Sequence, residues 1–581
     1  SGSAVFYVKD LNGKDGFRLD GGSSKDGSGH SVSYAGDLNK DGYDDIIIGA
    51  PEADGTAGEA YVVFGKRSWS RYMRLSSLNG KTGFTLSGDE SGDFTGKSVS
   101  TAGDIDGDGY DDIMIGAFLA TPNSVSEEGG KAYVFLGKKS GYSSTFDLTK
   151  LNGSNGFTFE SENGDDHLGR SVGTAGDIDG DGYDDMLMGA PYYESGHGRA
   201  YAYWGKNTSF LSRIGLGTIG DNGFKMSGGS GDRAGWSVDT AGDINGDGKD
   251  DLLISAYRAD AASDAINSGV QYVVFGKSKS DFDSSFTLKD LDGTDGFRLN
   301  GPNTNDYSGW SVSTAGDMNN DGYDDIIIGI PERTNTDKPG AFVYFGKSGG
   351  FTKEVELDTL NGSNGFKILG TPGNHLGWSV SNAGDINGDG FDDVVLGGPS
   401  PAEPVTDWVS AASKGEAYVL FGKKSGFSAN LNIDSVDDTE GFRIEGIDAG
   451  DELGYAVNTA GDINNDGYDD IIIGAPGAAS KKGESYVIFG GDFTGDSTVT
   501  GSSGEERLLA TEATSHSISE RRDNPITSGD ESEEDMENGD TCFGTETTGG
   551  QRNDEGRVME SFWQGDNSDL LMITDEHDEE E

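Results

Sequence analysis

The chain contains few of the residues that crosslink or stiffen a protein from within. Its single cysteine, Cys542, excludes an intramolecular disulfide, and only 12 of its 581 residues are proline, against 96 glycines. This balance favours many short strands joined by tight turns. No apolar run approaches the length needed to span a bilayer, so we expect no membrane insertion.

Positive charge is also scarce. The chain has 43 Lys and Arg against 102 Asp and Glu, which gives a formal net charge of −59. Such a surface repels phosphate backbones and anionic lipid headgroups. We therefore expect no nucleic-acid partner.

Recognisable catalytic groupings are missing from the sequence. The six histidines fall in no zinc-binding spacing, and no nucleophile elbow with its partners is present. Cys542 lies in an acidic stretch without a basic neighbour that would activate its thiol. We therefore expect that the protein is not an enzyme.

What the chain has instead is one acidic loop repeated seven times. The first copy runs from Asp37 to Asp45, and its equivalents begin at Asp104, Asp177, Asp243, Asp317, Asp385 and Asp462. Oxygen-bearing side chains occupy positions one, three, five and nine, and a glycine always follows the fifth. A hard cation such as Ca²⁺ prefers oxygen ligands, and the glycine permits the tight reversal that turns them inward. Position twelve, Ile48 in the first copy, lacks the glutamate that an EF-hand requires.

We therefore predict up to seven Ca²⁺ sites, with the backbone carbonyl of position seven as a further ligand in each loop. The predicted metal ligands are Asp37, Asn39, Asp41, Tyr43 and Asp45; Asp104, Asp106, Asp108, Tyr110 and Asp112; Asp177, Asp179, Asp181, Tyr183 and Asp185; Asp243, Asn245, Asp247, Lys249 and Asp251; Asp317, Asn319, Asp321, Tyr323 and Asp325; Asp385, Asn387, Asp389, Phe391 and Asp393; and Asp462, Asn464, Asp466, Tyr468 and Asp470. The aspartates at position eight, Asp44 in the first copy, are expected to face solvent or to cap the turn.

Each repeat also contains four short apolar segments bounded by Gly, Asn, Asp or Ser. In the first repeat they cover residues 29–33, 46–48, 60–64 and 83–86. Seven repeats of four strands predict an all-β fold, a seven-bladed β-propeller of four-stranded antiparallel blades over residues 1–490. The last repeat lacks its fourth segment, and the N-terminus has a spare one. We predict that residues 4–20 complete the last blade.

One position before the first strand of each blade is filled in several ways. It holds His30, Lys97, Arg170, Trp236, Trp310, Trp378 and Tyr455. These side chains either pack between blades and line the rim, or form an aromatic and basic ring that faces a ligand such as a sugar or an acidic group.

The composition changes after Phe489. Residues 501–581 carry a net excess of 19 negative charges and no lysine, so we expect the acidic tail, residues 491–581, to be disordered. A degenerate calcium β-roll is the alternative, and the apolar patch Leu570–Ile573 would suit a secretion signal or partner docking.

A family resemblance follows from the ends of the strands. Gly49-Ala50-Pro51 with Phe64-Gly65, and Gly474-Ala475-Pro476 with Phe489-Gly490, resemble the FG-GAP repeat of integrin α-subunit propellers. The resemblance covers about residues 1–490 and identifies a free-standing, bacterial-type relative. It implies metal loops on one face of the disc and ligands on the opposite face.

These observations favour an extracellular, calcium-binding adhesion or recognition module for a protein or glycan ligand. The alternative is a calcium-stabilised structural component of a surface layer or matrix, which self-association would support. An accessory domain of a hydrolase is a third hypothesis.

Overall fold

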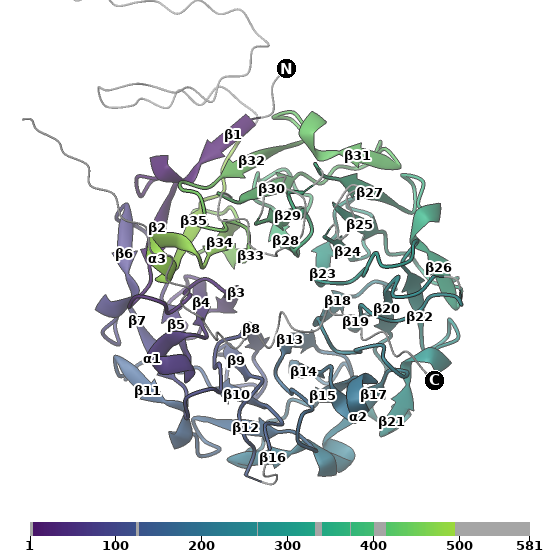
Figure 1. The fold of residues 1–581 in the computed structure, drawn as a ribbon, viewed down its shortest axis with the longest axis horizontal. Coiled ribbons are helices and arrows are strands. Elements are labelled where there is room, and N and C mark those ends of the chain that lie inside the picture. The colour runs from purple at the N-terminus through teal and green to yellow at the C-terminus, as the bar shows by residue number, and fades with distance from the viewer. Residues whose placement is uncertain are drawn as a thin grey trace, which may run out of the picture. The chain divides into compact units, whose positions relative to one another are not determined.

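The computed structural model describes residues 4–123, 127–263, 265–331, 340–371, 373–399 and 414–493. Seven β-sheets are arranged around a central axis (Figure 1), so the predicted seven-bladed propeller is confirmed. The tail hypotheses for residues 491–581 lie outside the described residues, apart from residues 491–493. Within the described part of the chain, no helix has the length and hydropathy required to cross a bilayer.

The innermost strand of each blade lines the axis, and each innermost strand neighbours that of the next blade. These strands are β3 (Ser31–Gly36), β8 (Ser98–Gly103), β13 (Ser171–Gly176), β18 (Val238–Gly242), β23 (Val312–Gly316), β28 (Ser379–Gly384) and β33 (Ala456–Gly461). Each contains small or hydroxyl-bearing residues, which suit the crowded centre of the ring.

The second strand follows the acidic loop and is the most apolar. These strands are β4 (Asp45–Ala50), β9 (Asp112–Ala117), β14 (Asp185–Ala190), β19 (Asp251–Ala256), β24 (Asp325–Ile330), β29 (Asp393–Gly398) and β34 (Asp470–Ala475). Their continuous apolar runs are buried on both faces because neighbouring blades cover the sheet from each side.

The third and fourth strands extend each blade outward in antiparallel order. The third strands are β5 (Glu59–Val63), β10 (Lys131–Phe135), β15 (Arg199–Tyr203), β20 (Val270–Val274), β25 (Gly340–Tyr344), β30 (Glu416–Leu420) and β35 (Glu484–Ile488). The fourth strands are β7 (Gly83–Ser87), β12 (Gly156–Glu160), β17 (Gly223–Ser227), β22 (Gly296–Asn300), β27 (Gly365–Leu369), β32 (Gly441–Glu445) and β2 (Gly16–Asp20).

Each blade also has a short fifth strand, which the sequence analysis did not predict. It runs parallel to the fourth strand and comes from the connection inside the following repeat, so the blades are mixed five-stranded sheets. The fifth strands are β11 (Thr145–Asp147), β16 (Arg213–Gly215), β21 (Ser285–Thr287), β26 (Glu354–Glu356), β31 (Asn430–Asn432), β1 (Ala4–Tyr7) and β6 (Tyr72–Arg74).

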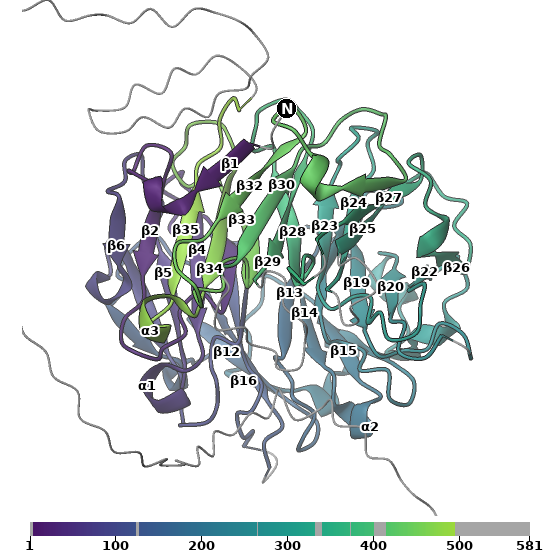
Figure 2. The same cartoon turned by 45° about the horizontal axis from the view of Figure 1, so that its top comes forward.

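The N-terminal segment closes the ring, as predicted, but it serves two blades. β2 pairs antiparallel with β35 and is the fourth strand of the seventh blade. β1 pairs parallel with β32 and is the fifth strand of the sixth blade. β1 lies beside β32 and β2 beside β35, in neighbouring blades (Figures 1 and 2).

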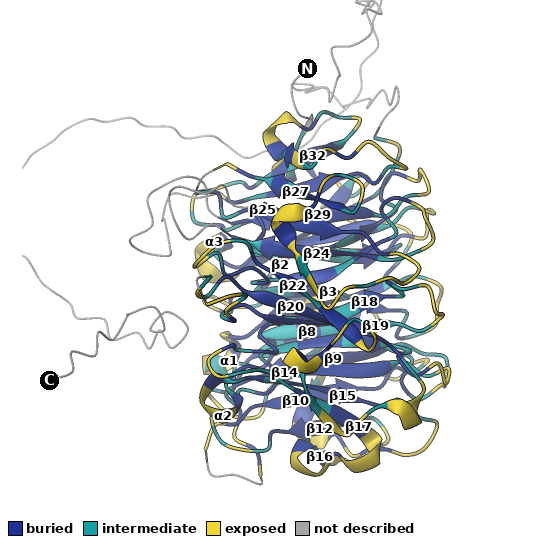
Figure 3. Cartoon of the chain, turned by 90° about the vertical axis from the view of Figure 1, so that its right-hand side faces the viewer, coloured by how far each residue is buried: buried dark blue, intermediate teal, exposed yellow. Residues whose placement is uncertain are grey.

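Among the described residues, helical structure is confined to single turns in the connections. Three four-residue helices, α1 (Ala53–Thr56), α2 (Tyr193–Gly196) and α3 (Ala478–Lys481), follow second strands. The 3₁₀ turns are η1 (Val8–Asp10), η2 (Leu75–Ser77), η3 (Leu148–Lys150), η4 (Leu216–Thr218), η5 (Gly220–Asn222), η6 (Lys279–Asp281), η7 (Leu288–Asp290), η8 (Leu357–Thr359) and η9 (Ile433–Ser435). Exposed residues gather in these connections, whereas the second and third strands of the blades are mostly buried (Figure 3).

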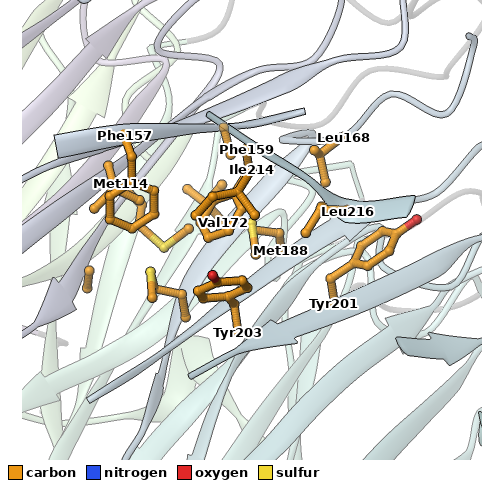
Figure 4. Close-up of a cluster of buried hydrophobic side chains, with 14 of the residues drawn as sticks. Met114, Phe157, Phe159, Leu168, Val172, Met188, Tyr201, Tyr203, Ile214 and Leu216 are labelled. Carbon is orange, nitrogen blue, oxygen red and sulfur yellow. The ribbon is translucent and has the colours of Figure 1, made fainter. Parts of the chain in front are cut away.

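The hydrophobic core is divided among the interfaces between blades. In one interface, Met114 and Phe157 of the second blade meet Met188 and Tyr203 of the third (Figure 4). Equivalent clusters fill the other interfaces, and the one between the seventh and first blades includes Phe17 of β2. Blade packing therefore fixes the positions of the loops that the blades carry.

Candidate metal centres and an axial ring

The first aspartate of each acidic loop organises the turn. The carboxylate of Asp37 accepts hydrogen bonds from the backbone N–H of Asp41 (3.0 Å) and of Gly42 (2.9 Å). Gly42 has a φ of +89°, in the left-handed region that glycine adopts without strain. The same two hydrogen bonds recur in the other six loops.

The ninth aspartate ties the loop to the rest of its blade. Asp45 is fully buried at the start of β4, and its carboxylate accepts from the N–H of Leu38 (3.1 Å) inside the loop and of Gly65 (2.9 Å) after β5. A Cβ on Gly65 would lie 2.2 Å from the carbonyl oxygen of Asp44. The Phe-Gly pair at the end of the third strand is therefore part of the loop's support.

The predicted side-chain ligands converge in the two loops that have aspartate at position three. In the second loop, carboxylate oxygens of Asp104, Asp106 and Asp108 lie within 4.8 Å of one another. In the third loop, those of Asp177, Asp179 and Asp185 do the same. These distances match ligands that share one ion.

Asparagine takes position three in the other five loops, and its orientation differs from that of a ligand in at least one. The Asn245 amide nitrogen lies 3.2 Å from both carboxylate oxygens of Asp251. Metal ligation through the amide oxygen requires this side chain to turn over.

The carboxylates of each acidic loop are packed together, so their negative charges repel one another. Burial raises the pKa of Asp185 and Asp470 to about 9 and that of Asp251 and Asp393 to about 8, and the other loop aspartates add to the shift. Hydrogen bonds from backbone N–H groups oppose this shift but do not cancel it. A divalent cation would relieve the repulsion directly.

The donor set fits a hard cation. It consists of oxygen atoms alone, and the Oδ2 atom of Asp179 is buried without a hydrogen-bond partner, although the Lys279 ammonium lies 3.9 Å away. A buried carboxylate oxygen with no donor is costly unless it binds a metal or a proton. The seven loops could therefore hold Ca²⁺ at the positions that the sequence indicates.

The eighth aspartate has a role that the sequence analysis did not identify. It does cap a turn, but the turn belongs to the preceding blade, so the acidic loops are linked around the ring. In every blade, the Oδ2 atom of the eighth aspartate accepts a hydrogen bond of 2.7–2.9 Å from the backbone N–H of the first loop aspartate in the preceding blade. We call this hydrogen bond the interblade latch. The donor–acceptor pairs are Asp37–Asp111, Asp104–Asp184, Asp177–Asp250, Asp243–Asp324, Asp317–Asp392, Asp385–Asp469 and Asp462–Asp44.

This interblade latch explains the glycine that ends each innermost strand. A Cβ on Gly103, which has a φ of +70°, would lie 2.2 Å from Oδ2 and 2.7 Å from Cβ of Asp184. Each equivalent glycine meets the eighth aspartate of the next blade in the same way. The Ala-Gly-Asp sequence before every loop is thus a packing requirement.

The seven variable residues of the sequence analysis come together at the opposite end of the innermost strands, and we call them the axial ring. Contacts run without a break from Arg170 through Trp236, Trp310, Trp378, Tyr455 and His30 to Lys97. Trp236 is buried and the others are half-buried. Packing between blades is therefore confirmed for these residues. Whether they also face a ligand is taken up below.

The backbone beside the axial ring is strained. Three residues before each ring member, φ lies between +52° and +60° in all seven blades. Only the first blade has glycine there, and the others have Phe94, His167, Arg233, Tyr307, His375 and Glu452. A non-glycine residue in this region costs of order 1 kcal/mol or more, and such strain gathers at functional sites.

Comparison with known proteins agrees with this geometry. The FG-GAP repeat family matches residues 28–63, 95–135, 168–203, 234–273, 308–345, 376–420 and 453–488, one match per blade. The domain is an FG-GAP propeller of the integrin α type. The Gly-Ala-Pro and Phe-Gly segments of this propeller end the second and third strands, beside the axial-ring face and the acidic loops respectively.

The relatives of this FG-GAP propeller include integrin α chains. Integrin alpha-V of Gallus gallus is 31% identical over 241 residues, which is 40% of this chain and 20% of the relative. Integrin alpha pat-2 of Caenorhabditis elegans is 32% identical over 193 residues, or 32% and 14% of the two chains. The chain thus spans about a fifth or less of these relatives.

A phosphatidylinositol-glycan-specific phospholipase D of Dictyostelium discoideum is also similar, at 27% identity over 212 residues, 34% of this chain and 21% of that protein. Among solved structures, Sqt1 from Chaetomium thermophilum aligns over 83% of this chain and 99% of its own, with a TM-score of 0.28 and 9% identity. A likeness at that level carries no argument about function.

Proposed function

We propose that the protein is an extracellular, calcium-binding recognition module that presents one face of its propeller to a protein or glycan ligand. Its similarity to integrin α chains supports an adhesion or recognition role. The observation that carries the calcium assignment is the crowding of buried carboxylates in the acidic loops. Residues 1–490 would form the propeller domain, with the acidic segment 491–581 outside it.

Calcium would bind at positions one, three, five, seven and nine of each loop. In the first loop these are Asp37, Asn39, Asp41, the carbonyl of Tyr43, and Asp45. A bound ion would neutralise the ninth carboxylate, and through the interblade latch each ordered loop would support its neighbour. Up to seven ions would thus hold the blades in place and fix the geometry of the opposite face.

The extracellular location follows from the expected affinity. Each loop is partly exposed and offers three or four charged ligands, which suits weak to moderate binding and therefore millimolar calcium. We propose no enzymatic activity, since the sequence contains no recognisable catalytic grouping. An accessory role beside a hydrolase is the least favoured alternative.

The metal assignment is tested by calcium titration of thermal unfolding. A site that binds only the folded state contributes about 2.7 kcal/mol at a hundredfold excess of calcium over Kd. Asp41→Ala should remove one such contribution, and EDTA should remove all of them. Asp358→Ala, an exposed aspartate in η8, is the matched control and should change nothing. An Asp41→Ala protein that melts like the wild type in millimolar calcium would disprove the assignment.

The recognition role is tested by binding of the full chain to an array of glycans and matrix proteins, with calcium and with EDTA. A calcium-dependent hit supports the proposal. A blank array, together with calcium-dependent self-association in light scattering, would instead favour a structural component of a surface layer or matrix.

A further inference from the structure

We propose that the axial ring binds a carboxylated sugar of an acidic glycan. This inference rests on the proposed recognition function and names its site and ligand class. The axial ring combines two chemistries in one continuous row of side chains: an aromatic arc of Trp236, Trp310, Trp378 and Tyr455, and a basic arc of His30, Lys97 and Arg170.

The aromatic arc suits the apolar face of a pyranose ring. Ring centroids are 5.1 Å apart between Trp236 and Trp310 and between Trp310 and Trp378, with interplanar angles of 51° and 47°. Rings tilted in this way do not cover one another as stacked rings would. The electron-rich faces of half-buried indoles attract the polarised C–H groups of a sugar. The innermost strands next to the arc line the propeller axis, so neighbouring rings can contact one ligand.

The basic arc suits the carboxylate. The Arg170 guanidinium lies 4.1 Å from the centroid of Trp236, which holds its plane, and within the described residues it has no ion pair. Its Nε atom is buried without a hydrogen-bond partner. The Lys97 ammonium lies 3.2 Å from the Nε2 atom of His30. A planar guanidinium is a favourable receptor for a carboxylate, and Lys97 precedes the adjacent innermost strand.

Charges around the axial ring orient the ligand. No member of the ring is acidic in a chain of net charge −59, so its positive charge is a local exception. The nearest carboxylates in sequence, Asp239 and Glu452, follow Trp236 and precede Tyr455 by three residues. Asp239 is held by the hydroxyl of Ser313 at 2.7 Å. Arg170 and Lys97 are the cationic members of the axial ring, so the sugar carboxylate belongs beside them.

The strained backbone beside the axial ring supports a role for the ring in binding. Glycine would satisfy the positive φ without cost, yet six blades place larger side chains there. Those side chains join the ring: Tyr307 lies 5.9 Å from Tyr257, which itself contacts Trp236 at 4.4 Å. An acidic peptide would use the basic arc but leaves the three tryptophans without a role, which is why we favour a glycan.

The experiment is calorimetric titration of the full chain, in millimolar calcium, with a trisaccharide of galacturonic acid and with its methyl ester. The ester keeps the sugar rings and removes the charge. We expect the acid to bind and the ester to bind at least tenfold more weakly. Arg170→Gln and Trp378→Leu should each weaken binding of the acid at least tenfold. Trp378→Phe should retain most of it.

Matched controls lie away from the axis. Arg71→Gln and Tyr72→Ala change an exposed arginine and an exposed tyrosine at the outer edge of the propeller and should leave binding unchanged. Each variant is first shown to melt at the wild-type calcium-loaded temperature. A ring variant that does not is replaced by Lys97→Met, which should also weaken binding of the acid.

The outcomes separate the two proposals. Uronate binding that survives the ring substitutions would overturn this site, and absence of uronate binding beside a calcium-dependent hit on the array would overturn the ligand class while leaving the recognition function. A synthetic peptide of residues 570–581, itself strongly acidic, is the peptide arm of the test. Stronger binding of that peptide than of the trisaccharide would also overturn the proposal.

Discussion

The two ends of the innermost strands differ in how their seven copies vary. At one end, every blade carries the same acidic loop with the same internal hydrogen bonds and the same latch to its neighbour. At the other end, equivalent positions hold five different residue types that form one asymmetric ring. Repetition of one chemistry suits a task that each blade performs for itself, namely stability. Variation around a single axis produces one surface, which suits recognition.

Loss of the closing strands should have the largest effect, because it disturbs both ends together. Deleting residues 1–20 removes β1 and β2, including the fully buried Phe17 and Leu19. Truncation of large buried side chains costs about 2–5 kcal/mol each, so the free energy of unfolding should fall by about 5 kcal/mol or more. Thermal or urea unfolding measures the change. Arg18→Ala, on the opposite side of the same strand, is the control, and an unchanged melt of the deletion variant would refute the closure.

A change in the interblade latch should act on the acidic-loop end alone. Gly103→Ala places a Cβ against the Asp184 carboxylate at a positive φ, and we expect a loss of about 2 kcal/mol or more. Gly92→Ala shares the positive φ (+100°) but has no atom within 4 Å of the added Cβ, so it reports strain without the clash. Equal losses for the two variants would argue against the latch.

When calcium is removed, the free energy of unfolding should fall as the pH rises. The raised pKa values of Asp185 and Asp470, about 9 against an ordinary 3.8, mean that the metal-free folded state holds more protons than the unfolded state between these values. The free energy of unfolding in EDTA should therefore fall as pH rises from about 4 to about 9. In calcium, the carboxylates are ionised in both states and this fall should vanish. Urea titrations at several pH values would show it, and rising stability in EDTA across the range would contradict the expectation.

A substitution in the axial ring should change the free energy of unfolding least. Lys97 is half-buried and its ammonium contacts His30 and the ring of Phe118. Lys97→Met keeps most of the side-chain volume, so the free energy of unfolding should change by less than about 1 kcal/mol. The calcium midpoint should not move. A loss of stability as large as that of Gly103→Ala would contradict the view that the acidic-loop end stabilises the fold and the axial-ring end serves recognition.

Local patterns in the sequence were sufficient for the blade count, the first four strands of each blade and the ring closure. The fifth strands were not predicted because they are short and mostly exposed. Tyr72–Arg74, for example, contains no buried residue that would indicate a strand. The interblade latch was not predicted for a different reason. It joins Asp37 to Asp111 across two blades, so it exists only once the blades have packed.

The candidate metal ligands followed from residue type and spacing, because all of them lie within nine consecutive residues. The supporting hydrogen bond from Gly65 to Asp45 did not, since the donor follows a different strand. The axial ring was recognised as one equivalent position, but its order of contacts depends on which blades are neighbours. The continuity from Arg170 to Lys97 could be read only from the fold.

The division of the N-terminal segment between two blades affects how a newly made chain reaches its final form. Gly16 pairs with Ile488, and Ala4 pairs with Phe442, so both N-terminal strands wait for the last two repeats to be synthesised. Until then the growing chain has unpaired strand edges at both ends, and such edges readily pair with other chains. Ring closure therefore waits until β35 has been synthesised. Incomplete chains that end before β35 leave β2 without its antiparallel partner and should associate through that unpaired edge.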